Sequence, residues 1–200
     1  MKKMKVYLAG PEVFDTKAKK IGKVLVKACK KKGLRGLYPL DNKITGCTSK
    51  AELSRAIYLA NKKMIDDADY VIANINQWRG QEPDSGTVWE IGYAVALGKP
   101  VYAYIDDPKK SYLDRMDSND VFYSDHRNPD EYLDSNDKII EHFDNPVNLM
   151  IFESITILGS FEACLHEIAK RAKNPRKELL KHILENEKNF SIMKRNSHNV

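Results

Sequence analysis

The sequence predicts an α/β domain built on a parallel β-sheet, and two observations indicate this class. Apolar segments of strand length alternate along the chain with longer segments whose apolar residues recur at helical spacing. One strand-length segment, residues 70–75 (YVIANI), is apolar almost throughout, as expected for a strand that helices cover on both faces of a parallel sheet. With 200 residues, the chain is long enough for one domain with a core of its own.

The order of the elements follows from apolar spacing and from the residues that end each segment. Gly10-Pro11 ends the first strand, Gly33 ends the first helix, and Pro39 ends the second strand. Ser49 and Glu52 open the second helix in the pattern of a capping box. The expected strands are residues 6–9, 36–39, 70–75, 101–105 and 154–157, and the expected helices are residues 15–32, 49–66, 86–97 and 160–172.

Two regions fall outside this alternation. Residues 106–147 are rich in Asp and Asn and show little periodicity, so we expect a loop or lid there and no second core. They lead into a short apolar element at 147–151. The domain is expected to span residues 1–172, and residues 173–200 are expected to form a basic helical tail without a catalytic part.

Charge and composition narrow the classes of function. The net charge is +5, but residues 173–200 hold seven Lys or Arg against three Glu. The rest of the chain is therefore near neutral, and we expect no nucleic-acid partner. The three Cys are far apart and odd in number, which favours a reducing, cytoplasmic location without a disulfide framework. No apolar run is long enough to span a bilayer, and the basic N-terminus runs at once into a strand, so we expect neither a membrane partner nor a signal peptide.

Motifs for metals and common cofactors are missing from the sequence. No Cys/His pair has metal-ligand spacing. No glycine-rich dinucleotide fingerprint follows the first strand, and no P-loop motif occurs. We therefore expect a site without a metal and without a cofactor.

One charged residue stands in a helix that is otherwise apolar or weakly polar. The segment GTVWEIGYAVAL (86–97) carries Glu90 as its only charge, and the pattern leaves no face of this helix built for solvent. A carboxylate in such a place must be paired, hydrogen-bonded or beside a cavity. One interpretation is a structural Glu paired with a Lys or Arg elsewhere; the other, which we favour, is a functional carboxylate at the ligand-binding edge.

The position of this helix brings further polar groups to the same edge. Ligands of open parallel sheets bind beyond the carboxyl ends of the strands, where Tyr7 can offer its phenol to a carboxylate. Asp84 stands just before the helix and is a candidate N-cap. With Glu82 and Glu90 it makes this edge acidic, which suits a neutral substrate. Carboxylates without a metal or cofactor favour displacement at an anomeric carbon.

Five segments of the chain occur in a characteristic order: YLAGPEVF (7–14), YPLDN (38–42), DADYVIANI (67–75), RGQEPDSGTVWEIGYAVALGKPV (79–101) and PVNLM (146–150). Together they resemble the nucleoside 2-deoxyribosyltransferase family over roughly residues 4–172. The resemblance implies a flavodoxin-like five-stranded parallel sheet with helices on both faces. It also implies transfer of 2-deoxyribose between nucleobases, purine or pyrimidine, without a cofactor.

The resemblance assigns roles to individual residues. Glu90 matches the nucleophile that attacks C1′ and forms a covalent deoxyribosyl-enzyme, and Tyr7 matches the hydroxyl that orients it. Asp84 matches the acid that holds the base and helps to protonate the departing nitrogen. Phe14 matches a wall for the base, with plain core packing as the alternative. Asn148 matches an asparagine that a neighbouring subunit lends to the sugar 5′-hydroxyl, which implies a homo-oligomer, dimer or hexamer.

Further substrate-binding positions rest on the resemblance alone. They are Gly10, Asp41, Asn61 and Met150. Asn61 stands where some members have an Asp that contacts the base, and a neutral amide can orient a base but cannot protonate it. Lys43 replaces a Gln that some members use for the base, so the base preference stays open.

Two other functions compete with transfer. The first is hydrolysis of 2′-deoxynucleosides or of their 5′-monophosphates with the same kind of Glu. Hydrolases of the monophosphates carry a small hydroxyl residue at the place of Asp84, where a carboxylate would repel phosphate. The second is a nucleoside-binding or signalling module without catalysis, which the fold alone cannot exclude.

Overall fold

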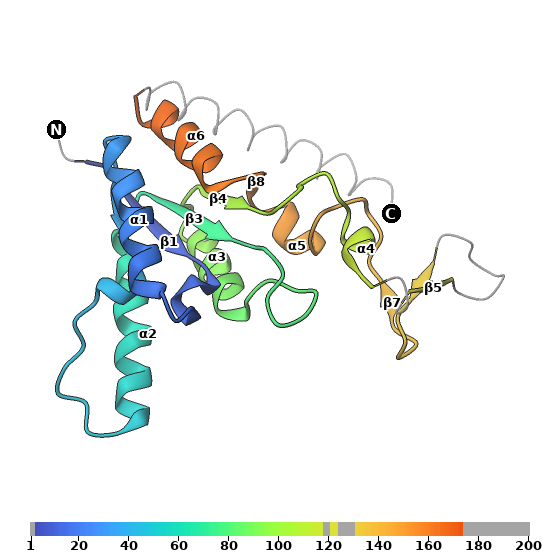
Figure 1. Cartoon of the computed structure of the whole chain (residues 1–200), viewed down its shortest axis with the longest axis horizontal. Coiled ribbons are helices and arrows are strands. Elements are labelled where there is room, and N and C mark those ends of the chain that lie inside the picture. Colours follow the sequence, from blue (N-terminus) through green and yellow to red (C-terminus); the bar gives the residue numbers. More distant parts are fainter. Residues whose placement is uncertain (1–2, 118–120, 124–130, 174–200) are drawn as a thin grey trace, which may run out of the picture.

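The computed structural model describes residues 3–117, 121–123 and 131–173. Its centre is a five-stranded, all-parallel sheet with the strand order β2-β1-β3-β4-β8, shown in Figure 1. The strands are β1 (Lys5–Ala9), β2 (Arg35–Leu37), β3 (Tyr70–Asn74), β4 (Val101–Tyr104) and β8 (Thr156–Leu158). This is the flavodoxin-like order, whose strand order reverses between β1 and β3.

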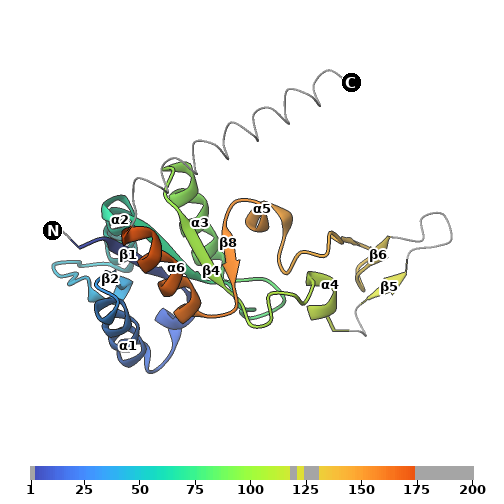
Figure 2. The ribbon, with the colours of Figure 1, turned by 90° about the horizontal axis from the view of Figure 1, so that it is seen from above.

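Helices cover both faces of this sheet, as the apolar run at residues 70–75 predicted (Figure 2). One core lies between the sheet and the helices α2, α3 and α5, and it contains Tyr7, Ile65 and Ile91. The other lies between the sheet and the helices α1 and α6, and it contains Leu8, Cys29 and Cys164. The helices are α1 (Ala18–Lys31), α2 (Lys50–Asp67), α3 (Ser85–Ala96), α5 (Leu149–Phe152) and α6 (Phe161–Lys173).

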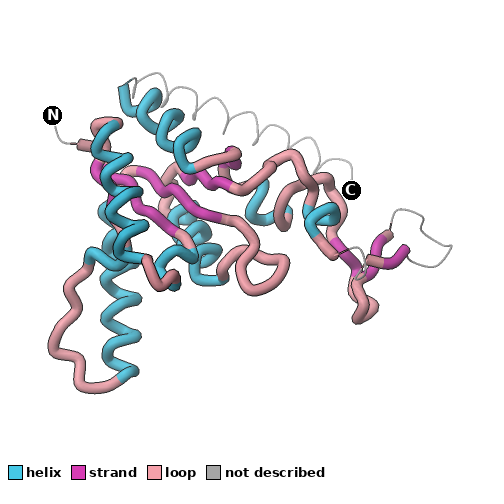
Figure 3. The backbone as a smooth tube through the Cα atoms, viewed as in Figure 1, coloured by secondary structure: helices cyan, strands magenta, loops and turns pink. Residues whose placement is uncertain are grey.

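Most element boundaries differ from the predicted ones by a few residues. A 3₁₀ turn, Pro11–Phe14, precedes α1, and a second one, Pro39–Asp41, follows β2. Proline at the start of each turn fixes φ at a value suited to a helical turn. The last strand begins at Thr156, two residues later than predicted. Figure 3 shows how these short turns link the strands to the helices.

The predicted capping box at α2 is half formed. The Ser49 side chain accepts a hydrogen bond from the Glu52 backbone N–H. The Glu52 carboxylate reaches past Ser49 and binds the N–H and the hydroxyl of Thr48. The cap therefore involves one residue more than the pattern predicted.

Residues 106–147 contain more regular structure than the predicted loop or lid. They hold a short helix, α4 (Tyr112–Arg115), and an antiparallel sheet of three two-residue strands. The strands are β5 (Phe122–Tyr123), β6 (Tyr132–Leu133) and β7 (Ile139–Ile140). Strands of two residues are too short to show alternation in the sequence. In Figures 1 and 2 this small sheet lies to the side of the main sheet, beyond α4.

Helix α3 differs from its prediction, because one of its apolar faces is exposed. Trp89 is 46% exposed and Leu97 is 45% exposed. The ring of Trp89 stacks on Tyr93, at 5.2 Å between centroids, and packs edge-on against Tyr58 of α2. The expectation that no face of this helix meets solvent is therefore wrong for the single chain.

No helix in the part of the chain that the structure describes is long and apolar enough to cross a bilayer. Of the predicted tail, only Lys173 lies within the described residues, where it ends α6. The remainder of that prediction falls outside them.

Candidate active site

Tyr7 and Glu90 meet at the carboxyl end of the sheet. Tyr7 lies in β1 between Leu37 and Val71 of the neighbouring strands and is completely buried. Glu90 lies in the second turn of α3 and is only partly accessible. The Tyr7 Oη donates a hydrogen bond of 2.5 Å to Glu90 Oε1, across 83 residues of sequence. The structure thus brings together the two residues that were predicted to pair.

The surroundings of Glu90 disfavour its charged form. Burial raises the pKa of its carboxyl from 4.5 to about 7, and the charge of Asp84 adds to the rise, while the hydrogen bond from Tyr7 opposes it. Burial also raises the pKa of Tyr7 far above its usual range, assisted by the charge of Glu90. The phenol is therefore a hydrogen-bond donor at all working pH values.

Glu90 has no cationic partner among the residues that the structure describes. The ion pairs found there involve other carboxylates, namely Asp66, Asp67, Asp144 and Glu167. The structural interpretation of Glu90 required a buried Lys or Arg, and the group that occupies this place is a neutral phenol. A carboxylate held by one short hydrogen bond keeps lone pairs available for a substrate.

Asp84 is the N-cap of α3, as predicted. Its Oδ2 accepts hydrogen bonds of 2.9 Å from both the backbone N–H and the hydroxyl of Thr87, which is buried. Such a cap holds the carboxyl group in one orientation. Its Oδ1 has no hydrogen bond to a described residue, so one oxygen is free for a ligand while the other is fixed.

Glu82 was predicted to make this edge acidic, but its carboxylate is engaged by a tyrosine of the segment 106–147. Its Oε1 accepts a hydrogen bond of 2.6 Å from Tyr112 Oη, at the start of α4. It therefore connects the loop before α3 to the segment 106–147.

Phe14 lies on the surface at the end of the first 3₁₀ turn. It is 58% exposed, so the alternative of plain core packing is wrong. Its ring stacks on Trp78 with 5.8 Å between centroids and 21° between planes. The guanidinium of Arg79 lies over both rings, 5.9 Å from the centre of Phe14 and 5.1 Å from that of Trp78. Trp78 and Arg79 were not among the predicted residues, although their place in the loop after a central strand could have indicated them.

A second carboxylate, Glu12, was also missed. Its Oε1 accepts hydrogen bonds of 2.7 Å from Asn74 Nδ2 and from Tyr104 Oη. Its Oε2 lies only 2.0 Å from the position that a Cβ of residue 10 would occupy, so Gly10 is needed for this packing. Glu12 stands two residues after Gly10 in the sequence, and nothing in the local pattern signals its distant partners.

Asp41 and Asn61 are linked through Asn42, the residue that follows Asp41. Asp41 is exposed at the end of the second 3₁₀ turn. Asn61, on α2, accepts a hydrogen bond of 3.2 Å from Asn42 Nδ2. Asp41 thus belongs to the turn and Asn61 to α2, and a role for them in substrate binding stays a prediction.

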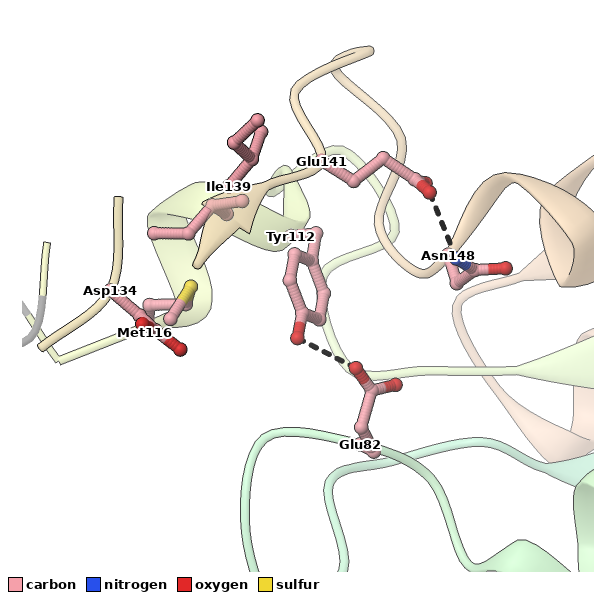
Figure 4. Close-up of a pocket in the computed structure, with 8 residues that line it drawn as sticks. Glu82, Tyr112, Met116, Asp134, Ile139, Glu141 and Asn148 are labelled. Atoms are coloured by element: carbon pink, nitrogen blue, oxygen red, sulfur yellow. Dashed lines mark hydrogen bonds between the residues drawn. The ribbon is translucent and has the colours of Figure 1, made fainter. Parts of the chain in front are cut away.

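Asn148 and Met150 lie at the start of α5, a short helix that packs against α3. Asn148 caps this helix, because its Oδ1 accepts a hydrogen bond from the Met150 N–H, and its Nδ2 donates one of 2.8 Å to Glu141 Oε2. Met150 is 73% exposed. Figure 4 shows Asn148 at the edge of a cavity of about 280 Å³. Its lining consists of Glu82, Tyr112, Met116, Asp134, Ile139, Ile140, Glu141 and Asn148.

The chemistry available at the Tyr7–Glu90 pair is that of carboxylates. Within the described ranges, no group of three or more His, Cys, Asp or Glu could hold a metal ion. The site offers a partly buried carboxylate as a nucleophile, a second carboxylate with a free oxygen and a phenol donor. These groups are suited to a double displacement at an anomeric carbon.

Comparison with known proteins identifies the family and the fold of the chain. The family model described as nucleoside 2-deoxyribosyltransferase matches residues 6–150. The chain is similar to a 2-desoxiribosyltransferase from Leishmania mexicana, with 28% identity, a TM-score of 0.65, and coverage of 84% of this chain and 97% of that chain. It also shares its fold with a 2-deoxyribosyltransferase from Bacillus psychrosaccharolyticus, at 21% identity and a TM-score of 0.50, covering 80% of this chain and 90% of that one.

A curated relative gives family likeness without an activity. It is an uncharacterized protein of Schizosaccharomyces pombe, 33% identical over 105 residues, or 51% of this chain. The match spans half the length of that relative. The family model covers well over half of this chain and includes Tyr7, Asp84, Glu90 and Asn148. The chain therefore belongs to the nucleoside 2-deoxyribosyltransferase family.

Proposed function

We propose that this protein is a nucleoside 2-deoxyribosyltransferase that moves 2-deoxyribose between nucleobases by double displacement at Glu90. The observation that supports this proposal most directly is the hydrogen bond of 2.5 Å between Tyr7 Oη and Glu90 Oε1. It holds a carboxylate at the carboxyl edge of the sheet without neutralising it by a cation. Family membership makes nucleosides the expected substrates.

In the first half-reaction, a carboxylate oxygen of Glu90 attacks C1′ of the bound nucleoside. The bond from C1′ to the base nitrogen breaks, its electron pair stays on that nitrogen, and the base leaves as it takes up a proton through Asp84. The sugar is then an ester of Glu90. In the second half-reaction a nitrogen of another base attacks C1′, the ester bond breaks with its electron pair returning to the Glu90 carboxylate, and the incoming base loses its proton through Asp84. Two inversions give net retention of configuration at C1′.

The proposed substrate is a neutral 2′-deoxyribonucleoside. A 2′-hydroxyl would crowd or hydrogen-bond the attacking carboxylate. The carboxylate of Asp84, at the start of α3, would repel a 5′-phosphate by like charge. Phe14, exposed beside this edge, offers an aromatic face to the base, and no cofactor takes part.

We further propose that the active protein is a homo-oligomer. In the single chain, α2 and α3 expose the apolar side chains of Ile57, Tyr58, Trp89 and Leu97, each more than 40% accessible. Exposed apolar side chains gathered on neighbouring helices are typical of an interaction surface. Within the described chain Asn148 hydrogen-bonds to Glu141 and to the Met150 N–H, and its donation to a neighbouring site rests on the resemblance.

The central test is a chromatographic assay of base exchange. The protein is incubated with deoxyinosine or thymidine together with adenine, alongside the Glu90→Ala variant. We expect deoxyadenosine from the wild-type protein and none from the variant. Free base and deoxyribose without deoxyadenosine would instead identify a hydrolase, and binding without turnover would identify a nucleoside-binding module.

The shared site has its own test, which uses two inactive variants. Glu90→Ala lacks the nucleophile, and Asn148→Ala lacks the proposed contribution to the neighbour. If Asn148 acts across subunits, mixing and reassembling the two variants restores activity, because some sites then combine Glu90 from one chain with Asn148 from another. Absence of any recovery after verified subunit exchange would refute the sharing of the site.

A further inference from the structure

Glu12 is a charged residue that the proposed reaction does not use. It lies in the 3₁₀ turn after β1, and no ion pair to it is present in the described part of the chain. Its carboxylate instead accepts hydrogen bonds from Asn74, the last residue of β3, and from Tyr104, the last residue of β4. One side chain therefore joins the carboxyl ends of three neighbouring strands.

The turn that carries Glu12 closes over Gly10. A Cβ at residue 10 would lie 2.0 Å from Glu12 Oε2 and 3.0 Å from Asn74 Cβ. At these distances the Glu12 carboxylate would have to move. The carboxylate folds back across the backbone of residue 10 and is held there by its two donors. This fixes the path of the chain from Gly10 to Phe14.

The same network continues into the loop after β3. Asn74 Oδ1 accepts hydrogen bonds from the backbone N–H of Asn76, at 3.0 Å, and from its Nδ2, at 2.8 Å. Asn76 Oδ1 in turn accepts one of 2.9 Å from the Asp106 N–H, in the segment after β4. The loop that begins at Asn76 contains Trp78, which stacks on Phe14.

We propose that Glu12 is a positioning residue, which holds Phe14 against Trp78 and thereby shapes the wall of the site that receives the base. This proposal rests on the proposed function, in which Phe14 faces the base. Glu12 acts through its hydrogen bonds and does not take part in the chemistry. Its Oε1 is occupied by two donors, and its Oε2 is packed against Gly10.

Substitutions at Glu12 separate these two kinds of role. Glu12→Gln keeps an oxygen that can accept from both Asn74 and Tyr104, whereas Glu12→Ala removes both bonds. A positioning role predicts that the Gln variant resembles the wild type and that the Ala variant does not. A role in proton transfer predicts that both variants lose activity alike.

Fluorescence of Trp78 reports directly on its stacking against Phe14, and this measurement does not depend on enzyme activity. The chain has two Trp residues, so a Trp89→Phe background leaves Trp78 as the reporter. We expect Glu12→Ala in this background to make Trp78 fluorescence more accessible to acrylamide, with roughly a twofold higher quenching constant as the stack on Phe14 loosens. Glu12→Gln is expected to leave quenching unchanged.

Steady-state kinetics report on how well the site binds the base. For the Ala variant we expect the KM values of the donor nucleoside and the acceptor base to rise roughly tenfold, with kcat within about threefold of wild type. Gly10→Ala should act in the same direction, because its Cβ displaces the Glu12 carboxylate. Since both changes disrupt one contact, the double variant should be no worse than the more severe single variant.

If Glu12→Ala fails to fold, the Tyr104→Phe variant tests the same network. It removes one of the two hydrogen bonds to Glu12 and keeps the ring that packs against Phe161. An increase in Trp78 quenching smaller than that for Glu12→Ala, or a smaller rise in KM, supports the proposal. Unchanged quenching and KM in Tyr104→Phe and Gly10→Ala would overturn it, as would a Gln variant as impaired as Ala.

The outcomes also distinguish this proposal from the proposed function. If the wild type transfers no deoxyribose, the quenching experiment still decides whether Glu12 positions Trp78 and Phe14. If the wild type transfers and the Glu12 variants match it in both readouts, the positioning role fails while the function stands.

Discussion

Replacing Glu90 by Gln should make the protein more stable at neutral and alkaline pH. The pKa of Glu90 is about 7 in the folded protein, against 4.5 for an ordinary Glu, chiefly because of burial. Between these two values the folded protein keeps a proton on Glu90 that the unfolded chain has released. The free energy of unfolding of the wild type therefore falls as the pH rises from about 4.5 to about 7 and then stays level.

The size of this effect follows from the two pKa values. At about 1.4 kcal/mol for each pH unit between them, the ionised carboxylate costs the folded state about 3 kcal/mol. Because Glu90 is partly accessible, water screens some of this cost and 3 kcal/mol is an upper bound. Gln cannot ionise, and its side-chain oxygen can still accept the hydrogen bond from Tyr7.

Urea unfolding followed by circular dichroism at pH 4.5, 6, 7 and 8 measures the difference. We expect wild type and Glu90→Gln to be equally stable at the lowest pH and the variant to be more stable by up to about 3 kcal/mol at pH 8. Protein concentration is held constant, since assembly also changes apparent stability. Glu153→Gln, at an exposed position just after α5, is the matched control.

One result would refute the reasoning about burial. If Glu90→Gln and the wild type show the same pH dependence of unfolding, Glu90 ionises as freely in the folded protein as in the unfolded chain. The site would then not be a desolvated pocket, and the raised pKa could not shape the activity profile.

Three other predictions concern neighbouring features. Tyr7→Phe removes the hydrogen bond that lowers the pKa of Glu90, so the acid limb of the pH profile of kcat/KM should move upward by about one unit; an unmoved limb would contradict this. Asp84→Ala should reduce transfer and destabilise the protein by about 1 kcal/mol through loss of the α3 cap, whereas Asp84→Asn should reduce transfer and keep stability, as thermal unfolding can measure. Trp89→Glu places a charge on the exposed apolar face of α3 and should reduce the assembly to monomers in analytical ultracentrifugation; an unchanged sedimentation coefficient would locate the interface elsewhere.

Features with a local signal could be predicted from the sequence. The apolar run at residues 70–75 indicated a strand buried on both faces, and the structure confirms it as β3. Asp84 stands immediately before an apolar helix, and it caps α3. The prediction for residues 106–147 missed α4 and the strands β5 to β7. A helix of four residues and strands of two residues are too short to show a periodic pattern of apolar residues.

The residues of the site could be predicted only in part from the sequence. Glu90 could be singled out because a lone charge in an apolar helix contradicts its surroundings, and Tyr7 lies at the expected sheet edge. Glu12 could not be singled out, because its importance lies in contacts with Tyr104 and Asn74, and Trp78 had only its place in the loop after a central strand to indicate it. The exposed face of α3 was also missed, because an apolar pattern does not say whether a helix is covered by its own chain.

By itself, the sequence determined the class of the fold and the identity of its unusual carboxylate. Both depend on local properties: the period of apolar residues, the residues that end helices and strands, and one charge in an apolar helix. Tertiary structure alone decided that Glu90 has no cationic partner among the described residues and that Glu12 joins the ends of three strands. Such pairings depend on which segments the sheet brings side by side, and no local pattern of residues encodes that.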